Sequence, residues 1–259
     1  MPGMLTDKRL LITGVTTHRS IAFAIAREAQ REGAEIALTT HGERRPLTER
    51  AARRLDDPPA VLELDVRREA DAAAVAAELE RRWGGLDGVV HSIAFGEPDA
   101  LEGDFIAAPT EAVLESFAAS ALSLRLLAQA FAPLLERADT GSIVGLDFDA
   151  TVAWPGYGWM GVAKGGLESI ARYLAHALGP RGIRVNLVSA GPLRTVASHG
   201  YENFEDVAAN WPRRAPLGWD ADDPSGVAQG VCFFLSDWSR QVSGEILHVD
   251  GGHHAIGVP

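Results

Sequence analysis

The sequence predicts an α/β fold, a doubly wound parallel sheet of seven strands with helices on both faces. Short apolar runs alternate with longer segments in which apolar residues recur at helical spacing. The apolar runs are nearly continuous, which is typical of parallel strands buried on both faces. The chain has 259 residues, 46% of them hydrophobic, so a single domain spanning residues 1–259 can bury a large core.

The first elements of the chain form a βαβ unit, the building block of a Rossmann-type sheet. Residues 9–15 (RLLITGV) predict a strand, and a helix with an apolar face begins after Ser20. Gly33 ends that helix at the C′ position, and residues 34–39 predict the second strand. This segment therefore predicts two strands joined by a helix packed across them.

The turn from Gly14 to Ser20 is a candidate phosphate-binding turn. It lacks the full G-x-G-x-x-G pattern, and a plain turn with an N-capping serine is the alternative. Gly14 would let a pyrophosphate approach the backbone, while Ser20 and the amide of Ile21 lie at the positive end of the helix. We therefore expect Gly14, Ser20 and Ile21 to bind a dinucleotide.

The loop after the second strand is where a dinucleotide fold recognises the adenosine ribose. No Asp or Glu ends this strand, and Arg44 and Arg45 follow it on a polar loop. These arginines could meet the 2′-phosphate of NADPH, but arginines in such loops are more often solvated. We expect NADH as the cofactor, with NADPH as the alternative.

The rest of the chain continues the alternation of strands and helices. An alanine-rich helix is predicted at residues 69–83 and a longer one at 111–136. A further helix begins near Gly156, and the last spans residues 224–237. The remaining predicted strands are residues 60–66, 86–94, 142–146, 183–188 and 245–249.

The carboxyl ends of parallel strands meet at one edge of the sheet, where ligands of such folds bind. Asp65, followed by Val66, could accept from an adenine amino group there, although a solvated loop aspartate is the alternative. The end of the fourth strand would lie over the cofactor, and Asp147-Phe148 ends the fifth. The other residues expected at this edge are Ser92, Ile93, Ala94, and the segment Ser189-Ala190-Gly191-Pro192.

Tyr157 and Lys164 are the leading candidates for chemistry. They are seven positions apart, about two helical turns, so both side chains can lie on one face of the helix that begins near Gly156. Such a pair alone usually means a half-buried ring and a solvated charge. Its place after the strand that ends in SIVGLDF favours a phenol and an ammonium group acting together at the crevice.

Composition argues against several other functions. The net charge of −11 is unsuited to binding nucleic acid. The one cysteine, Cys232, lies in an apolar run and predicts a buried, inert thiol. No secretion signal is visible, and polar residues interrupt the longest apolar helix, residues 113–135. We expect a cytoplasmic protein that binds neither membranes nor nucleic acid.

Six segments carry a resemblance to a known family: SIAFAIA at 20–26, LDGVVHSIAF at 86–95, SIVGLDF at 142–148, YGWMGVAKGGLES at 157–169, RVNLVSAGPLRT at 184–195 and LHVDGG at 247–252. Together they resemble the short-chain dehydrogenase/reductase superfamily, and more closely its enoyl-acyl-carrier-protein reductase branch. Members that reduce ketones resemble one another in placing three residues between the tyrosine and the lysine, after a strand-end serine. Here the gap is six, Phe148 precedes the pair and the glycine turn also departs from their pattern, so the resemblance implies reduction of a carbon-carbon double bond.

The resemblance implies roles for individual residues. Tyr157 would donate to the thioester oxygen of a trans-2-enoyl substrate on acyl carrier protein or coenzyme A, and Lys164 would hold the nicotinamide ribose of NADH. Phe148 would shield the nicotinamide and, with Met160, contact the acyl chain, although core packing is the alternative for both. The loop Gly191, Pro192, Leu193 and Thr195 would pass the nicotinamide amide, with Thr195 reaching the pyrophosphate.

The resemblance also implies features beyond the catalytic residues. Residues 196–214 resemble a substrate-covering segment that is short, which predicts medium or ordinary fatty acyl chains although Phe148 resembles the type serving very long ones. The carboxyl-terminal region resembles surfaces that form homotetramers. His253 and His254 lack further ligands and are expected to be solvated, so no metal is expected.

Two other functions stay open at this point. A ketoreductase of polyketide or other secondary metabolism would use the same fold, and a dinucleotide-sensing protein would bind the cofactor without turnover. The presence of both Tyr157 and Lys164 speaks against the sensor.

Overall fold

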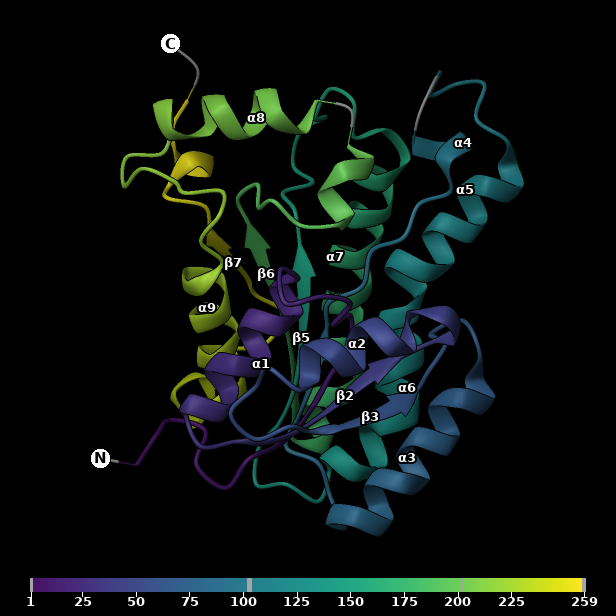
Figure 1. Ribbon diagram of the computed structural model, residues 1–259, viewed down its shortest axis with the longest axis vertical. Helices are drawn as coiled ribbons and strands as arrows, with labels where there is room; N and C mark the ends of the chain where they lie inside the picture. Colours follow the sequence, from purple (N-terminus) through teal and green to yellow (C-terminus); the bar gives the residue numbers. More distant parts are fainter. Residues whose placement is uncertain (1, 102–103, 202, 258–259) are drawn as a thin grey trace.

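Seven parallel strands form the centre of the molecule (Figure 1). The computed structural model describes residues 2–101, 104–201 and 203–257. The strands lie in the order β3-β2-β1-β4-β5-β6-β7, and each pairs in parallel with its neighbours, which confirms the predicted sheet. They are β1 (Arg9–Ile12), β2 (Glu35–Thr40), β3 (Ala60–Glu63), β4 (Gly88–His91), β5 (Gly141–Asp147), β6 (Ile183–Ala190) and β7 (Ile246–Val249).

The strand order reverses between β1 and β4. The chain winds outward from β1 to β3 in one direction and from β4 to β7 in the other. In open α/β sheets the loops at the carboxyl ends of strands on either side of this switch point separate and leave a crevice for ligands. Gly14 follows β1 and Ser92 follows β4, so both lie at this point.

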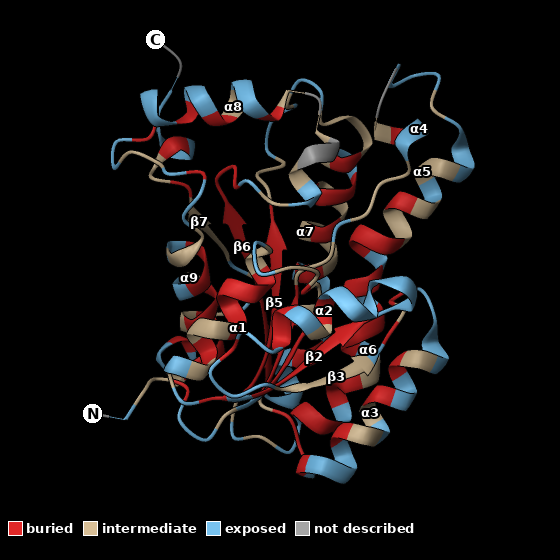
Figure 2. Ribbon diagram, in the orientation of Figure 1, coloured by how far each residue is buried: buried red, intermediate tan, exposed pale blue. Residues whose placement is uncertain are grey.

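Helices cover both faces of the sheet (Figure 1). Alternate residues of a strand belong to opposite hydrophobic cores. Leu10 and Ile12 of β1 pack with α1 (Ile21–Arg31) and α9 (Ser225–Leu235). Leu11 packs with α3 (Glu69–Trp83) and α6 (Ser123–Leu135) on the other face. Strands buried from both sides need apolar residues at every position, which is the physical reason for the continuous runs. Figure 2 shows the central strands buried and the outer faces of the helices exposed, while the edge strands β3 and β7 are only partly buried.

The helix bounds agree with the sequence in most places. The helix predicted at 69–83 is α3 (Glu69–Trp83), and Ser20 and Gly33 flank α1 (Ile21–Arg31) as N-cap and C′ residue. The other helices are α4 (Pro98–Leu101), α7 (Gly158–Leu178), α8 (Phe204–Asn210) and α9 (Ser225–Leu235). One-turn 3-10 segments are η3 (Gly179–Arg181), η4 (Ala197–Gly200), η5 (Trp211–Arg213), η6 (Asp237–Ser239) and η7 (His253–Ala255).

A two-turn helix was missed. Residues 40–45 were expected to be a loop, but η1 (Gly42–Arg44) leads directly into α2 (Arg45–Ala52). The sequence RPLTERAA shows little apolar face, yet Thr48, Ala51 and Ala52 are buried. Burial of these small side chains against the core therefore stabilises a helix that periodicity does not reveal.

The long helix predicted at 111–136 is not continuous. It divides into α5 (Thr110–Phe117), the π-helical turn η2 (Ala118–Leu122) and α6 (Ser123–Leu135). This stretch, residues 110–135, has an apolar window with a mean hydropathy of 1.4, long enough to cross a membrane, but 67% of that window is buried within the fold. Its apolar side chains therefore serve the core against α3 and α7.

Three buried serines explain the interruption. Ser120 Oγ accepts from the amide of Phe95 and donates to its carbonyl, at 2.9 and 2.7 Å. Ser116 Oγ accepts from the amide of Glu97 at 2.9 Å, and Ser123 Oγ lies 2.7 Å from His91 Nε2. The π turn, a feature found frequently at functional sites, thus accompanies serines that hold the loop after β4.

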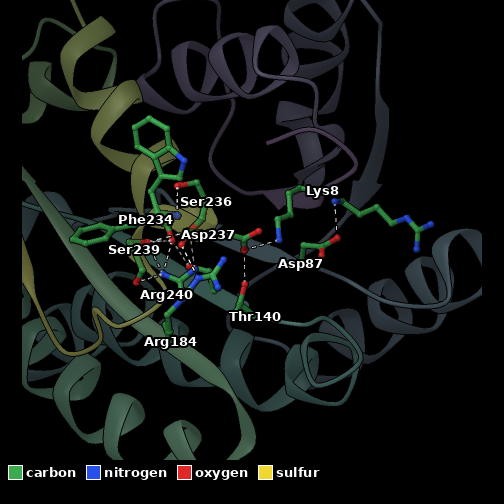
Figure 3. Close-up of polar contacts among 12 residues, drawn as sticks. Lys8, Asp87, Thr140, Arg184, Phe234, Ser236, Asp237, Ser239 and Arg240 are labelled. Carbon is green, nitrogen blue, oxygen red and sulfur yellow. Dashed lines mark hydrogen bonds and ion pairs between the residues drawn. The ribbon is translucent and has the colours of Figure 1, made fainter. Parts of the chain in front are cut away.

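A polar cluster lies at the end of α9 (Figure 3). The guanidinium of Arg184, on β6, donates to the carbonyls of Phe234, Ser236 and Ser239. Nearby, Asp237 accepts from Lys8 at 3.0 Å and from Thr140 at 2.7 Å (Figure 3). These contacts join α9 and η6 to the sheet.

Candidate active site

Tyr157 and Lys164 lie on one face of α7. Tyr157 is the N-cap residue, and its carbonyl accepts from the amide of Met160 at 3.0 Å. Lys164 follows two turns later, is 5% exposed, and donates from Nζ to the carbonyl of Leu146 at 2.8 Å. The face that bears both side chains therefore points towards the end of β5.

The Tyr157 hydroxyl is available as a hydrogen-bond donor. It forms no hydrogen bond with any other residue that the structure describes. Burial, together with Asp147 and Tyr201, raises the pKa of Tyr157 well above its ordinary value. The group is therefore a neutral phenol at physiological pH, which is the form that can donate a proton.

Aromatic rings surround Tyr157. The centroid of the Phe148 ring lies 5.1 Å away at an interplanar angle of 61°, and that of Tyr201 lies 5.3 Å away at 62°. Phe148 also contacts Trp154 and Trp211, at 5.2 and 6.0 Å. These five residues, Phe148, Trp154, Tyr157, Tyr201 and Trp211, are referred to below as the aromatic cluster.

The sequence did not single out three members of the aromatic cluster. Trp154, Tyr201 and Trp211 come from the loop before α7 and from the substrate-covering segment, and only the tertiary structure brings them together. An excess of aromatic residues in two polar loops beside the candidate tyrosine is the signal that could have found them.

Met160 is buried, at 6% exposure, one turn after Tyr157 on α7. It is not part of the two main core clusters that pack against the sheet. Its position near the aromatic cluster is compatible with a contact to an acyl chain.

The switch point brings Gly14 and Ser92 into contact. Gly14 has a φ of +85°, and a Cβ built on it would lie 1.8 Å from the carbonyl oxygen of Ser92. Thr13 Oγ1 accepts from the amide of Ser92 at 3.2 Å and donates to the carbonyl of Val90. Only glycine allows both the conformation and the close approach at this position.

The turn before α1 ends in an N-cap. Ser20 Oγ accepts from the amide of Phe23 at 3.3 Å and donates to the carbonyl of Thr17 at 2.8 Å. The amides of Ile21 and Ala22 donate to no other residue within the described ranges. Unpaired amides at a helix amino end are the groups that bind phosphate.

Strand β4 ends at His91, earlier than expected, so Ser92, Ile93 and Ala94 belong to the following loop. Ile93 packs against the core on the α6 side. The serine contacts to Phe95 and Glu97 described above hold this loop from behind, so residues 92–94 remain at the crevice beside Gly14.

Asp65 and Val66 follow β3, which ends at Glu63. The Asp65 carboxylate accepts from Arg67 Nε at 3.0 Å and Nη2 at 2.9 Å, and this hydrogen bonding lowers the pKa of Asp65. Arg67 also pairs with Glu115. The carboxylate is therefore held in place by Arg67, and an adenine amino group would have to share it.

The loop after β6 is fixed by backbone and indole contacts. The amide of Gly191 donates to the carbonyl of Val249 at 3.0 Å, and Trp219 Nε1 donates to that of Pro192 at 2.7 Å. Leu193 is buried, and the amide of Ser198 donates to Thr195 Oγ1 at 3.2 Å. Thr195 is thus already engaged in the turn that begins η4.

The substrate-covering segment, residues 196–214, contains η4, α8 and η5. Tyr201 donates from its hydroxyl to the carbonyl of Pro155 at 2.9 Å, which joins this segment to the loop before α7. Phe204 and Ala208 pack with Ala221 in a small separate core cluster. The segment therefore lies beside the aromatic cluster and Tyr157.

The expectation that both carboxyl-terminal histidines are solvated was wrong for His253. Its ring stacks on Trp211 with centroids 3.7 Å apart and planes at 11°, and it is 6% exposed. His254 Nδ1 lies 3.0 Å from an oxygen of Asp250. No group of three potential metal ligands clusters among the residues that the structure describes.

A buried carboxylate, Asp147, is the last residue of β5. It is 5% exposed, and no side chain that the structure describes donates a hydrogen bond to either of its oxygens. Burial raises the pKa of Asp147 to about 7, and the charge of Lys164 opposes this rise. The sequence placed Asp147 at a strand end but assigned it no role.

The geometry agrees with comparisons to known proteins. A family model described as enoyl-(acyl carrier protein) reductase matches residues 14–254. The chain is 42% identical to the enoyl-[acyl-carrier-protein] reductase [NADH] of Mycobacterium avium, over 97% of this chain and 98% of that protein. It is 38% identical to the FabI enzyme of the same description from Escherichia coli (strain K12), over 96% of this chain and 95% of the relative. The chain belongs to the enoyl-acyl-carrier-protein reductase family.

Proposed function

We propose that this chain is an enoyl-[acyl-carrier-protein] reductase that uses NADH to reduce trans-2-enoyl thioesters in type II fatty acid biosynthesis. One observation carries the proposal: Tyr157 and Lys164 share a face of α7 directed at the end of β5, beside the switch point of the sheet. The names of the relatives from Mycobacterium avium and Escherichia coli support the same reaction and the same cofactor.

The residues at the crevice fit a dinucleotide. The close contact of Gly14 with Ser92 and the unpaired amides at the start of α1 provide a place for a pyrophosphate. Asp65 and Val66 would lie at the adenine, and Lys164 at the nicotinamide ribose. The remaining residues proposed to line the cofactor are Ser20, Ile21, Ser92, Ile93, Ala94, Gly191, Pro192, Leu193 and Thr195. NADH, when bound, supplies the hydride that reduces the β-carbon of the substrate.

Arg45 gives little support for binding the 2′-phosphate of NADPH. Arg45 donates to Glu49 at 2.9 Å, to Glu63 at 3.4 Å and to the carbonyl of Val61 at 3.1 Å. Its guanidinium is therefore used to join α2 to β3. This network, like the relatives' names, favours NADH.

Tyr157 would act on the thioester. Negative charge develops on the thioester oxygen as the double bond is reduced, and a phenol that donates to this oxygen stabilises the charge where the transition state creates it. The raised pKa keeps Tyr157 protonated until that moment. Lys164, held by the carbonyl of Leu146, would orient the ribose and thereby position the reacting carbon.

Phe148 and Met160 would contact the acyl group. The substrate-covering segment is short and offers few apolar residues to wrap a long tail, so we propose chains of medium or ordinary length, from octenoyl to hexadecenoyl. The substrate would be carried by acyl carrier protein or coenzyme A.

We also propose that residues 1–259 act as one catalytic domain. The protein would be a cytoplasmic homotetramer that binds neither membranes nor nucleic acid. The net charge of −11 supports the absence of nucleic-acid binding.

A single set of assays tests the proposal. The absorbance of NADH and of NADPH is followed with dodecenoyl thioester, with acetoacetyl thioester, and with neither. Oxidation of NADH that requires the enoyl thioester is the expected result. Turnover with acetoacetyl thioester alone would indicate a ketoreductase, and binding of NADH without any turnover would indicate a sensor; either would overturn the proposal.

A further inference from the structure

Asp147 has no structural partner that explains its burial. Both carboxylate oxygens are inaccessible, and no side chain described by the structure donates a hydrogen bond to them. Buried polar groups are nearly always hydrogen-bonded, because leaving them unpaired costs free energy. A carboxylate kept in this position therefore calls for another explanation.

Lys164 carries the positive charge that acts on the Asp147 carboxylate. Lys164 Nζ donates to the carbonyl of Leu146, the residue directly before Asp147, so the ammonium group lies against the end of β5. Burial lowers the pKa of Lys164, and Asp147 is the group that opposes this effect. The two side chains are thus each other's main counter-charge in a place from which water is largely removed.

The other titratable groups around this pair do not replace Asp147. His91, on neighbouring β4, is fully buried, and burial with the charge of Lys164 lowers its pKa to about 3, so it is neutral. Glu168, on α7, pairs with Arg172 at 3.7 Å. Asp149, in the loop after β5, accepts from the amide and hydroxyl of Thr151, and Tyr157 is a neutral phenol.

We propose that Asp147 is a positioning residue whose buried carboxylate holds Lys164 in the ammonium form that binds the hydroxyl groups of a ribose. The identity of the ligand rests on the proposed function, whereas the effect of the Asp147 charge on Lys164 does not. Burial lowers the pKa of Lys164, and the charge of Asp147 opposes this effect, so a carboxylate at position 147 favours the ammonium form. A neutral residue at position 147 removes this charge, and the pKa of Lys164 should then fall.

The choice of lysine agrees with this role. The chain contains only two lysines, Lys8 and Lys164, so arginine supplies almost all of its positive charge. Arginine stays charged wherever it is placed, whereas a buried lysine depends on its surroundings to keep a proton. A lysine at this site therefore needs a counter-charge, and Asp147 provides it.

The small number of lysines also makes a direct test practical. Protein grown with lysine labelled with ¹³C at Cε gives two resonances, and each reports the protonation of its own amine. The titration of Lys164 is compared in the wild-type protein and in Asp147→Asn, without cofactor or substrate. Lys8, which pairs with Asp237, is the internal reference.

The expected result is a Lys164 pKa that is lower by about one unit or more in Asp147→Asn, a tenfold change in the ammonium fraction at a given pH. Asp149→Asn is the matched control and should leave Lys164 within a few tenths of a unit. Should Asp147→Asn fail to fold, Asp147→Ser removes the same charge with a smaller side chain. The same Lys164 titration in wild type and variant would overturn the proposal.

Cofactor affinity supplies a second readout. NADH binding, measured by fluorescence from pH 7 to pH 9, should weaken by about tenfold in Asp147→Asn and much less in the wild type, and Asp147→Glu should restore the wild-type profile. If NADH affinity changes with pH in the same way in the wild type and in Asp147→Asn, Asp147 does not help Lys164 to bind the ribose. A shifted Lys164 titration in a protein that reduces no enoyl thioester would support the pairing and overturn the proposed function, so the two failures are distinguishable.

Discussion

The ring of Tyr157 meets the ring of Phe148 edge to face, with centroids 5.1 Å apart and an interplanar angle of 61°. This arrangement is favourable for aromatic pairs and needs no hydroxyl group. The ring of Tyr201 also meets the ring of Tyr157 edge to face, with centroids 5.3 Å apart. The position of the Tyr157 ring is therefore set by its neighbours, and its hydroxyl can be removed without moving it.

Tyr157→Phe should lower turnover by about 100-fold, because one donor to the developing oxyanion is lost. NADH affinity should stay within about twofold of the wild type, since the phenol is not required for binding. Steady-state rates with dodecenoyl thioester and fluorescence titration with NADH measure the two effects. Tyr173→Phe is the matched control, because Tyr173 lies on the same helix but is 75% exposed. Unchanged turnover in Tyr157→Phe would remove Tyr157 from the mechanism.

Tyr201→Ala should shift the chain-length preference towards longer substrates. The Tyr201 ring covers Tyr157, and its hydroxyl joins the substrate-covering segment to Pro155. Removing the ring opens the aromatic cluster, so the ratio of kcat/KM for hexadecenoyl to octenoyl thioester should rise by about tenfold. Tyr201→Phe keeps the ring and should leave the ratio near that of the wild type. A wild-type preference for chains well beyond hexadecenoyl would contradict the proposed limit to medium or ordinary chains.

The strands and the longest helices could be predicted from the sequence because their signals are local. Strands buried on both faces require continuous apolar residues, and α3 has fifteen residues with a regular apolar face. The short helix α2 could not be predicted, because its burial depends on small side chains that pack against another element. The π turn η2 could not be predicted either, since it accompanies contacts between Ser120 and a loop 25 positions away.

The candidate site divides in the same way. Tyr157 and Lys164 follow from spacing on one helix, and Gly14 and Ser20 follow from the order of strand, turn and helix. Trp211 and His253 become part of the site only through a stacking contact between residues 42 positions apart. Asp147 was visible as a strand-end carboxylate, but its unpaired oxygens depend on which helix covers it.

His91 should make the protein sensitive to acid. It is completely buried, and Ser123 Oγ donates to the carbonyl of Ala119, so His91 Nε2 is the donor to that hydroxyl and Nδ1 is left unpaired. The pKa of His91 in the fold, about 3, lies below its ordinary value of 6.5. The unfolded chain therefore binds more protons in this range, and stability is present above pH 6.5 and lost as the pH falls towards 3.

Urea unfolding between pH 7 and pH 4 measures this loss. The free energy of unfolding of the wild type should fall as the pH falls, and His91 should account for up to about 1.4 kcal/mol of this fall per pH unit. The variant His91→Asn should lack that part of the fall. His176→Asn is the control, because His176 lies exposed near the end of α7. If the free energy of unfolding depends on pH equally in the wild type and in His91→Asn, the protonation of His91 does not destabilise the fold and the prediction is wrong.

Arg184 should stabilise the fold without taking part in catalysis. Its guanidinium donates to the carbonyls of Phe234, Ser236 and Ser239 and to the hydroxyl of Ser239, where α9 ends (Figure 3). A positive charge there also suits the negative end of the helix dipole. These are buried, charge-assisted hydrogen bonds, and they lie towards the opposite end of β6 from the loop at Gly191.

Arg184→Met should therefore lower the free energy of unfolding by about 3 kcal/mol, because it leaves several carbonyls without a donor while keeping much of the side-chain volume. Denaturant unfolding at pH 7 gives this value. Arg181→Met removes an exposed guanidinium that pairs with Glu136 and should change stability by less than about 1 kcal/mol. The turnover per folded molecule should be unchanged in both variants, since the cluster at the end of α9 touches none of the residues around Tyr157. A loss of turnover in folded Arg184→Met would mean that strain at this end of β6 reaches the crevice, which the separation of the two sites does not predict.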